Sequence, residues 1–459
     1  MPLINFNSLI IFLSIFQLYI QKLLFVNVHF RHGARSSLYL IDKQNRDLLG
    51  NHWDKRGILT SKGKRQVFLN GIKHRERYSN FLSYKNIEDE IKAYSTDSYR
   101  SICSLQCYLN GLYDNNDIKE NLFKEGEETI YPPGNISADM LKKVEQLGMS
   151  AIPKDNHLIP INIFQKSTHS FVLHEVGRIS DCQKIGEIRE KNVIKNKINE
   201  MAKKFEEKYS DKLNNFFISN NISLTKDFDY SFYKLNQFCD SLYANVIEKR
   251  DLSKLNQSIN FNFDELYNDC FKIISKIQSD YVAGDKDVVL MSQSPPIKKL
   301  ITWMDQRIEL DKKGKGDSVV SGSPRFTIWS GHDSSIANFE MFMKINFNSK
   351  WIFPGFSTTV LFELHKNEEK NIYEIKYFVN DEMLLNINYN DFKRKVLDII
   401  WNEEKIEKFC KFNIITAGKM DIEIKKYHKY IAILILLLFL SISFNIYNLF
   451  KGRRKLKEN

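Results

Sequence analysis

Charged side chains crowd into one short stretch near the start of the sequence, FRHGARSS at residues 30–37. Arg31, His32 and Arg35 in this stretch directly follow an apolar run that predicts a buried strand. Arginine carries planar, permanently charged donors that bind phosphate oxygens in pairs, and a histidine imidazole can attack phosphorus and hold it covalently. The stretch is therefore either a solvated basic loop or an anion pocket that contains a nucleophile.

Two later clusters of charged residues also follow predicted strands. Arg100 lies in STDSYRS, a few residues beyond a strand predicted at 91–96. His332 and Asp333 lie in SGHDSS, after a strand predicted at 325–331. Each cluster alone has a plainer explanation, such as a helix cap formed by Asp333. Ligands bind at the carboxyl ends of strands in open α/β sheets, so neighbouring strands would bring these side chains together.

Together the three clusters have a chemical meaning. Three arginines around one point match a phosphoryl group, whose transition state carries charge on its equatorial oxygens. An aspartate beside a second histidine can give the leaving alkoxide its proton, which requires Asp333 to be protonated. The arginines favour the neutral form of His32 and so keep its attacking nitrogen free at acidic pH. Both conditions indicate an acidic pH optimum.

The elements that must position these residues follow from hydrophobic patterns. The first strand is predicted at 23–30, and Thr60 can cap a helix within 51–73. Further predictions are helices at 98–112, 295–310 and 334–345 and a β-hairpin at 357–380. From 113 to 285 the pattern is mostly helical and polar. Strand and helix units thus flank a helical middle, which predicts an α/β sheet domain with a helical insertion.

Composition excludes some classes of protein. The 459 residues are 43% hydrophobic and 27% charged, which is ordinary for a globular chain and argues against disorder. The net charge of +11 could suggest nucleic acid as a partner. Yet the lysines are spread along the chain among acidic residues, and no dense basic block is interleaved with aromatic residues. We therefore expect no nucleic-acid partner and assign most of the charge to solvated surface.

Both ends of the chain carry apolar stretches. Residues 8–20 are uncharged and apolar and suit a secretory signal, with an uncleaved anchor as the alternative. Residues 430–450 contain no charge, and roughly 20 such residues cross a bilayer, so they predict a transmembrane helix rather than a buried core helix. The basic tail that follows favours a cytosolic end. The expected topology is single-pass type I, with the body of the protein luminal or extracellular.

Cysteines and sequons agree with export. Six cysteines suggest disulfides, and Cys103 and Cys107, one helical turn apart, are each expected to reach a distant partner. No Cys-x-x-Cys or zinc-finger histidine pair occurs, so no metal site is expected. Three glycosylation sequons begin at Asn135, Asn221 and Asn256 and would have to lie at the surface.

The motif set as a whole resembles the histidine acid phosphatase family, the branch of the histidine phosphatase superfamily that includes lysosomal and prostatic acid phosphatases and phytases. RHGARS is similar to the Arg-His-Gly-x-Arg-x-Pro signature, and WDKRGILTSKGKRQ to the Trp-x-x-Gly-x-Leu-Thr-x-x-Gly stretch. YSTDSYRS and WSGHDSS resemble the later Ser-Thr-Asp-x-x-Arg and His-Asp motifs. The resemblance runs from about residue 23 to about 395. It departs at Ser37, where the signature has proline.

The resemblance implies a role for each matching residue. His32 is the nucleophile that forms phosphohistidine, and Asp333 is the proton donor. The phosphate is bound by Arg31, Arg35, Arg100 and His332. His29 matches no catalytic role and is expected to pack beside the pocket. The family needs no metal or other cofactor. Its fold is a phosphoglycerate mutase-like mixed sheet flanked by helices, with a helical cap insertion, to which this sequence adds the C-terminal transmembrane helix.

The expected organisation combines these readings. It comprises a signal peptide (1–21), an α/β catalytic domain (22–104 and 286–395), a helical cap insertion (105–285), a luminal stalk (396–429), a transmembrane helix (430–450) and a cytosolic tail (451–459). We expect a membrane-anchored acid phosphatase of a lysosome, vacuole or cell surface that acts on phosphate monoesters, with homodimerisation left open. Two alternatives are a phosphohistidine mutase or phosphotransferase, and an inactive receptor or adhesion protein on the same fold.

Overall fold

The structure is a computed structural model. It describes residues 21–41, 44–83, 87–113, 137–147, 159–164, 182–189, 192–220, 222, 232–259 and 262–410. The chain divides into two compact units, residues 1–402 and 403–459. In the second unit the described part is one helix, α14 (Glu403–Cys410).

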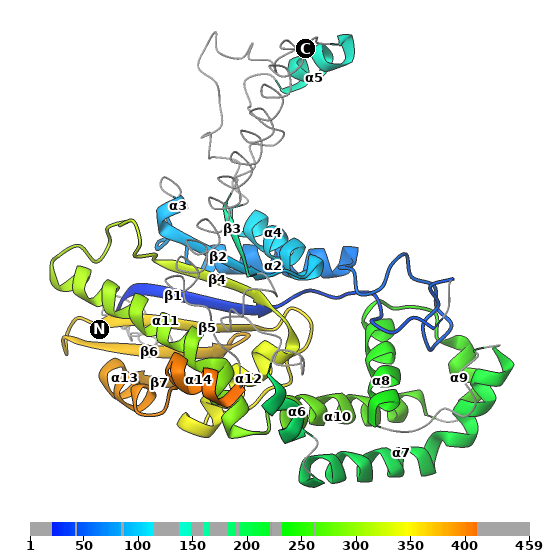
Figure 1. Ribbon diagram of the computed structural model, residues 1–459. Coiled ribbons are helices and arrows are strands. Elements are labelled where there is room, and N and C mark those ends of the chain that lie inside the picture. The colour runs from blue at the N-terminus through cyan, green and yellow to red at the C-terminus, as the bar shows by residue number, and fades with distance from the viewer. Residues whose placement is uncertain are drawn as a thin grey trace, which may run out of the picture. The chain divides into compact units, whose positions relative to one another are not determined.

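A seven-stranded mixed sheet organises the first unit, with the strand order β3-β2-β4-β1-β5-β6-β7 (Figure 1). The first four strands of this order run parallel, and β5, β6 and β7 continue the sheet antiparallel. The strands are β1 (Gln21–Arg31), β2 (Ile91–Thr96), β3 (Ile161–Phe164), β4 (Phe326–Gly331), β5 (Thr359–Asn367), β6 (Ile372–Val379) and β7 (Glu382–Asn388). This is the mixed sheet with flanking helices that the sequence predicts, extended at its two edges by β3 and β7.

Strand β1 is buried on both faces, which explains why its sequence is a nearly continuous apolar run. Side chains alternate between the faces of a strand. Val28 and Phe30 therefore join the core formed with helices α2 (Ser61–Arg77) and α4 (Tyr99–Leu112). On the opposite face Phe25 packs against Trp303.

Three helices cover that opposite face: α11 (Lys286–Lys312), α12 (Asp333–Phe347) and α13 (Tyr389–Leu397). The prediction of a helix starting near Pro295 was wrong, because α11 begins nine residues earlier than Pro295. Asp285 caps it by accepting hydrogen bonds from Asp287 and Val288 N–H. Pro295 and Pro296 lie inside the helix, where burial of α11 against the sheet outweighs the backbone hydrogen bonds that they remove.

The helical middle of the chain builds a second hydrophobic core. Its helices are α6 (Gln183–Arg189), α7 (Asn192–Ser219), α8 (Phe232–Ile247), α9 (Ser253–Ile259), α10 (Phe263–Lys276) and the π-helix η4 (Ile277–Val282). Buried side chains such as Phe205, Phe238 and Leu266 pack there, together with Leu48 and Leu49 from the N-terminal part of the chain. Two further helices are α3 (Ile87–Glu90) and α5 (Ala138–Leu147).

The predicted fold class is corrected in one respect, because the structure supports the mixed sheet with flanking helices but not the transmembrane helix. No helix within the described ranges is long and apolar enough to cross a bilayer. Residues 430–450, on which that prediction rested, lie outside those ranges, as do residues 1–20 of the expected signal peptide (1–21) and the expected tail. Strand β1 begins at Gln21, whose side chain bonds Glu374.

The cysteines are partly as expected. Cys239 on α8 and Cys270 on α10 form a disulfide, and Cys182 and Cys410 are also disulfide-bonded. Cys103 and Cys107 are free thiols on α4, so the prediction that each reaches a distant partner was wrong. Of the three sequons, Asn256 is exposed on α9, while Asn135 and Asn221 lie outside the described residues.

Candidate active site

The carboxyl ends of β1, β2 and β4 meet at one edge of the sheet. β4 lies between the other two strands, and the register pairs Arg31 with Gly331 and Ser95 with Ser330. The residues that follow these strand ends, including His32, Arg100 and His332, therefore come together as the sequence predicts. The same register places β2 and β1 on the two sides of the His332–Asp333 turn.

Two glycines let the turn after β1 lie directly on the start of α2. A Cβ atom at Gly33 would overlap the Gly63 carbonyl group, and one at Gly63 would overlap the backbone of Ala34. The Ala34 carbonyl oxygen also accepts hydrogen bonds from the Thr60 backbone N–H and hydroxyl, at 3.1 and 3.2 Å. The RHGARS and ILTSKGK motifs are therefore two halves of one backbone contact.

His32 is held in a single neutral tautomer. Its Nδ1 lies 2.8 Å from the Gly33 carbonyl oxygen, which can only accept a hydrogen bond, so Nδ1 carries the proton. Its Nε2 lies 3.0 Å from Arg100 Nε, which can only donate, so Nε2 presents its lone pair. Burial, followed by the charges of Arg100 and Arg31, lowers the pKa of His32 well below its ordinary value of 6.5. The ring is therefore uncharged, with the lone pair of Nε2 facing Arg100.

Arg100 also contacts the second histidine. Its Nη2 lies 3.1 Å from His332 Nδ1, which must accept, and His332 Nε2 lies 3.1 Å from the Thr96 hydroxyl. The two imidazole rings meet edge to face with their centroids 5.5 Å apart. One guanidinium group thus bridges both histidines, and β2 supplies the hydroxyl that orients the second one.

Arg31 is almost completely buried and is held on three sides. Its Nη1 donates to the Pro354 carbonyl oxygen at 2.8 Å, and its Nη2 lies 2.7 Å from Asp333 Oδ2. The guanidinium group stacks 4.3 Å above the centre of the Phe356 ring. These contacts fix the plane of the guanidinium group at the carboxyl end of β1.

The carboxyl group of Asp333 is subject to opposing effects. Burial would raise its pKa, but the charges of Arg31 and Arg35 outweigh burial and lower the pKa below 3.8. His332 and the backbone N–H of Ser334 act in the same direction. Asp333 is therefore ionised in the free protein, paired with Arg31 at the first position of α12.

Arg35 is paired with a carboxylate that the sequence motifs do not contain. Its Nη2 lies 2.8 Å and its Nη1 3.3 Å from the two carboxylate oxygens of Asp240 on α8. Asp240 raises the pKa of Arg35, against the opposing effect of burial. The Nε atoms of Arg35 and Arg31 are buried and have no hydrogen-bond partner within the described part of the chain. Those donors could bind an anion.

His29 and Ser37 both have structural explanations. His29 packs against Phe339 with centroids 5.9 Å apart, and burial lowers its pKa to about 3, so it is a neutral core residue as expected. Ser37 is fully buried, and its hydroxyl accepts a hydrogen bond from the Tyr39 N–H and lies 2.9 Å from the Ser241 hydroxyl. The residue that departs from the family signature therefore ties the motif to α8.

Sequence reasoning missed several residues at the site. Phe356 follows a Pro-Gly turn in FPGFS, and Asp240 and Tyr243 lie on α8 in an ordinary helical pattern. Tyr243 stacks on Phe356 at 5.1 Å and so backs the ring that carries Arg31. The Pro-Gly turn was a usable signal, whereas nothing local distinguishes Asp240 from a solvated helical carboxylate.

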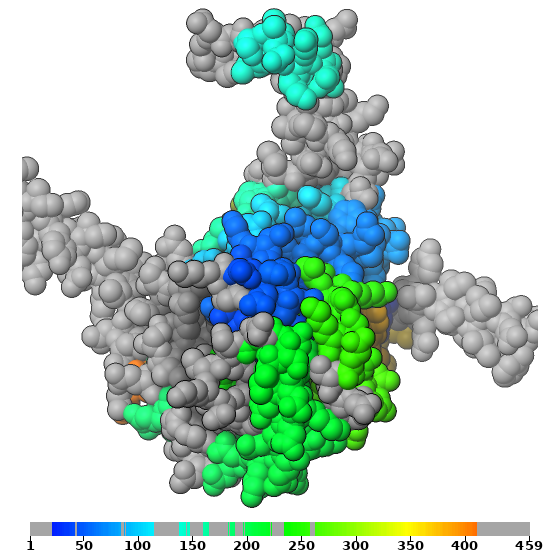
Figure 2. Space-filling model, turned by 90° about the vertical axis from the view of Figure 1, so that its right-hand side faces the viewer, coloured from blue at the N-terminus to red at the C-terminus, as the bar shows by residue number. Residues whose placement is uncertain are grey.

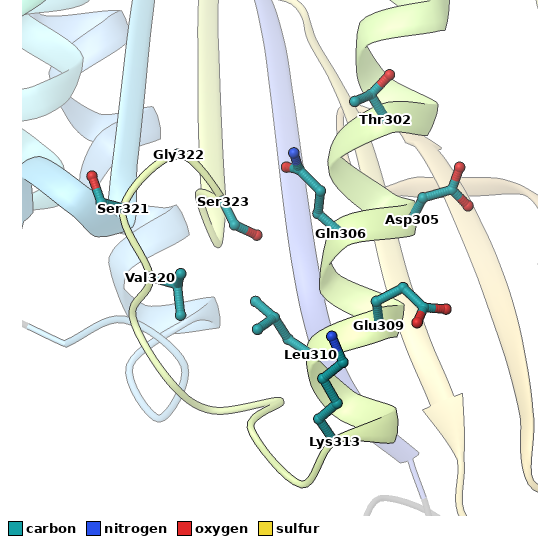
Figure 3. A pocket seen from close by; sticks show the side chains of 10 residues that line it. All are labelled: Thr302, Asp305, Gln306, Glu309, Leu310, Lys313, Val320, Ser321, Gly322 and Ser323. Carbon is teal, nitrogen blue, oxygen red and sulfur yellow. The ribbon is translucent and has the colours of Figure 1, made fainter.

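A separate cavity of about 540 Å³ lies between α11 and residues 320–323 (Figure 3). Those residues precede β4, whereas His332 follows it, and a six-residue strand spans roughly 20 Å. The side chains of Gln306, Glu309 and Lys313 line this cavity. It contains none of the predicted site residues and lies at the opposite end of the sheet.

Comparison with known proteins agrees with this geometry. The phytase of Hafnia alvei in complex with tartrate has a TM-score of 0.53 and 12% identity, over 83% of this chain and 98% of that chain. The phytase of Citrobacter braakii has a TM-score of 0.52 and 11% identity, over the same shares. At such identity the likeness shows the fold alone. No curated protein gives a significant sequence match.

The sequence itself matches a family model across most of its length. The model describes the histidine phosphatase superfamily (branch 2) and covers residues 22–380, from the start of β1 to the turn after β6. That range includes His32, Arg100 and Asp333. This chain therefore belongs to branch 2 of the histidine phosphatase superfamily.

Proposed function

We propose that this protein is an acid phosphatase that hydrolyses phosphate monoesters through a phosphohistidine on His32, with Asp333 as the proton donor. The observation that carries the proposal is the locked tautomer of His32, with Nδ1–H on the Gly33 carbonyl oxygen and Nε2 facing Arg100. A neutral imidazole with its lone pair among three arginines is suited to attack a bound phosphoryl group.

In the first step the substrate phosphate takes the donors of Arg31, Arg35 and Arg100. This releases Nε2 of His32, which attacks phosphorus, so that a P–N bond forms as the P–O bond to the leaving group breaks. His332 Nδ1 loses its donor when Arg100 turns to the phosphate. It can then bind a proton and donate a hydrogen bond to a phosphate oxygen. This requirement adds to the acidic preference.

Asp333 supplies the proton that the leaving oxygen needs. In the free protein Arg31 holds Asp333 ionised, with a lowered pKa. A bound phosphate competes for the same guanidinium group, which weakens the ion pair and raises the proton affinity of Asp333. In the second step water attacks the phosphohistidine, Asp333 takes the proton from that water, and the P–N bond breaks to free His32.

We also propose that the catalytic body is exported to an oxidising compartment. The disulfide between Cys239 and Cys270 supports this, because such bonds rarely persist in a reducing cytosol. Phytases share the fold, and inositol phosphates are one class of phosphate monoester among others for a substrate panel.

The test is hydrolysis of an aryl phosphate by the purified protein at roughly pH 5, with and without a chelator. We expect activity in both cases and its loss in His32→Ala. Full activity in that variant would exclude the covalent mechanism. Loss of wild-type activity in the chelator would exclude the metal-independent reaction.

A further inference from the structure

Helix α8 runs along the segment that carries the catalytic motif, and Figure 2 shows the helical segment in green against the N-terminal part of the chain in blue. Side chains in the second half of α8, and Glu248 directly after it, bond residues of that segment. The pairs are Asp240 with Arg35, Ser241 with Ser37, Asn245 with Asp47, and Glu248 with Thr60. The contact is therefore a series of polar bonds over residues 240–248 rather than a single ion pair.

The Arg35–Asp240 pair stands out in this series because of its burial. The Arg35 side chain is 2% exposed and that of Asp240 17% exposed. A buried guanidinium group needs a carboxylate or several carbonyl groups to offset the loss of hydration. Its other contacts are a hydrogen bond of 3.3 Å to the Ser36 carbonyl oxygen and the Phe356 ring, whose centre is 5.4 Å away, and both are longer than the 2.8 Å bond from Nη2 to Asp240. The orientation of Arg35 therefore depends mainly on Asp240.

We propose that Asp240 is the positioning residue of Arg35. It binds both terminal nitrogens of the guanidinium group and thereby presents the remaining Nε edge to a phosphate oxygen of the substrate. The inference rests on the proposed function, since it concerns how the same pocket binds phosphate. It assigns to the helical segment a part in phosphate binding that acts through Arg35.

The surroundings of Asp240 hold it in place from both sides. Cys239, the preceding residue, is joined to Cys270 on α10. One turn further along α8, Asn245 donates at 2.6 Å to the buried Asp47, which also accepts from Trp53 Nε1 at 2.8 Å. A carboxylate on so constrained a helix can fix the guanidinium plane, whereas one on a mobile loop could not.

Positioning and simple charge make opposite predictions for Asp240→Asn. If the carboxylate only adds negative charge near the pocket, its removal should tighten the binding of phosphate anions. If it positions Arg35, removal should weaken inhibition by inorganic phosphate and lower kcat/KM by roughly 10- to 100-fold, because a small displacement of a binding group has effects of that size. Asp240→Glu, which can still pair with Arg35, should recover part of the loss.

The decisive experiment is a double-mutant cycle with Arg35→Ala. Asp240→Asn should change kcat/KM by less than about twofold in the Arg35→Ala background, because its effect passes through that arginine. Asp269→Asn is the matched control, since Asp269 precedes the other disulfide cysteine and pairs with Lys208 away from the site. Its kinetic constants should equal those of the wild type.

Two results would overturn the inference: tighter phosphate inhibition in Asp240→Asn, or an equal loss from Asp240→Asn with and without Arg35. Far-ultraviolet circular dichroism and thermal unfolding of each variant separate misfolding from misplacement. If Asp240→Asn does not fold, the Asp240→Glu variant alone decides. A raised inhibition constant for phosphate would support the positioning role, and an unchanged constant would contradict it. An inactive wild-type protein would instead refute the proposed function.

Discussion

Arg31 Nη2 lies 2.7 Å from Asp333 Oδ2, so the proposed phosphate ligand and the proposed proton donor neutralise each other before substrate binds. The same pairing occurs at Arg35, whose carboxylate partner comes from α8. Each carboxylate lets a cation remain in a buried position, and each must share that cation with the incoming phosphate. Arg31 and Arg35 are thus each paired with a carboxylate before substrate binds.

The first prediction concerns stability against pH. The pKa of Asp333 is lower in the folded protein than its ordinary value of 3.8. Its ion pair therefore stabilises the folded state at pH values above 3.8, and this contribution is lost as the pH falls through the folded-state pKa. Asp333→Asn leaves buried Arg31 without its charged partner, which costs about 1–3 kcal/mol. We expect the variant to unfold at a lower temperature than the wild type at neutral pH.

The difference between the two proteins should shrink as the pH approaches the folded-state pKa, because the wild-type carboxylate then becomes protonated. Thermal unfolding of both proteins across a pH series measures this difference in unfolding temperature. A difference that stays constant across the whole series would show that Asp333 contributes no charge-dependent stability. Asp391→Asn, which removes an exposed carboxylate on α13, serves as the control.

The second prediction separates Asp333 from the other groups by the nature of the leaving group. An alkyl phosphate expels a basic alkoxide that needs a proton, whereas a nitrophenolate leaves readily without one. Asp333→Asn should lower kcat for alkyl phosphates by about 10²- to 10⁴-fold, the usual contribution of a general acid. The loss for nitrophenyl phosphate should be much smaller. Equal losses for both substrates would argue against proton donation.

The third prediction concerns the covalent intermediate. His32→Ala should lower kcat by on the order of 10⁵-fold, since removal of a nucleophile leaves only binding and electrostatic effects. Rapid quenching of the wild type with labelled substrate should give an alkali-stable, acid-labile phosphoprotein whose label maps to the peptide that contains His32. His29→Ala provides a comparison in the same peptide and should retain the label.

The fourth prediction concerns the disulfide between α8 and α10. The two cysteines are 31 residues apart in sequence, and closing a loop of this length stabilises a protein by about 3–4 kcal/mol through the unfolded state. Replacing both Cys239 and Cys270 by serine should lower the denaturation midpoint accordingly. Cys103→Ser removes a free thiol and should change it little.

Local signals were enough to predict that His32, Arg100 and His332 meet at one edge of the sheet. The strands that end at Arg31, Thr96 and Gly331 are largely buried, and the charged residues follow within four positions, so their meeting depended only on strand adjacency. The glycines at 33 and 63 confirm why two separate motifs belong together. The family match extends over the same elements.

The contact between α8 and the N-terminal motif was beyond the reach of sequence patterns. Asp240 is 205 residues from Arg35, and its helix has the same amphipathic pattern as its neighbours. Pro295 and Pro296 pointed to a helix start because they lack N–H donors, yet burial of α11 and the Asp285 cap decided otherwise. Ser37 stands where the family signature has proline, and the sequence did not reveal that its hydroxyl would bond Ser241 on α8.

The parallel pairing of β1 with β4 has a consequence for the order of folding. Arg100 is 68 residues from His32 and 232 residues from His332, so the pocket exists only after segments far apart in the sequence have closed the centre of the sheet. Contacts of such separation form slowly, whereas helices form early. During refolding, the helical circular dichroism signal should therefore return before enzymatic activity. The rate at which activity returns would then report the last long-range step of folding.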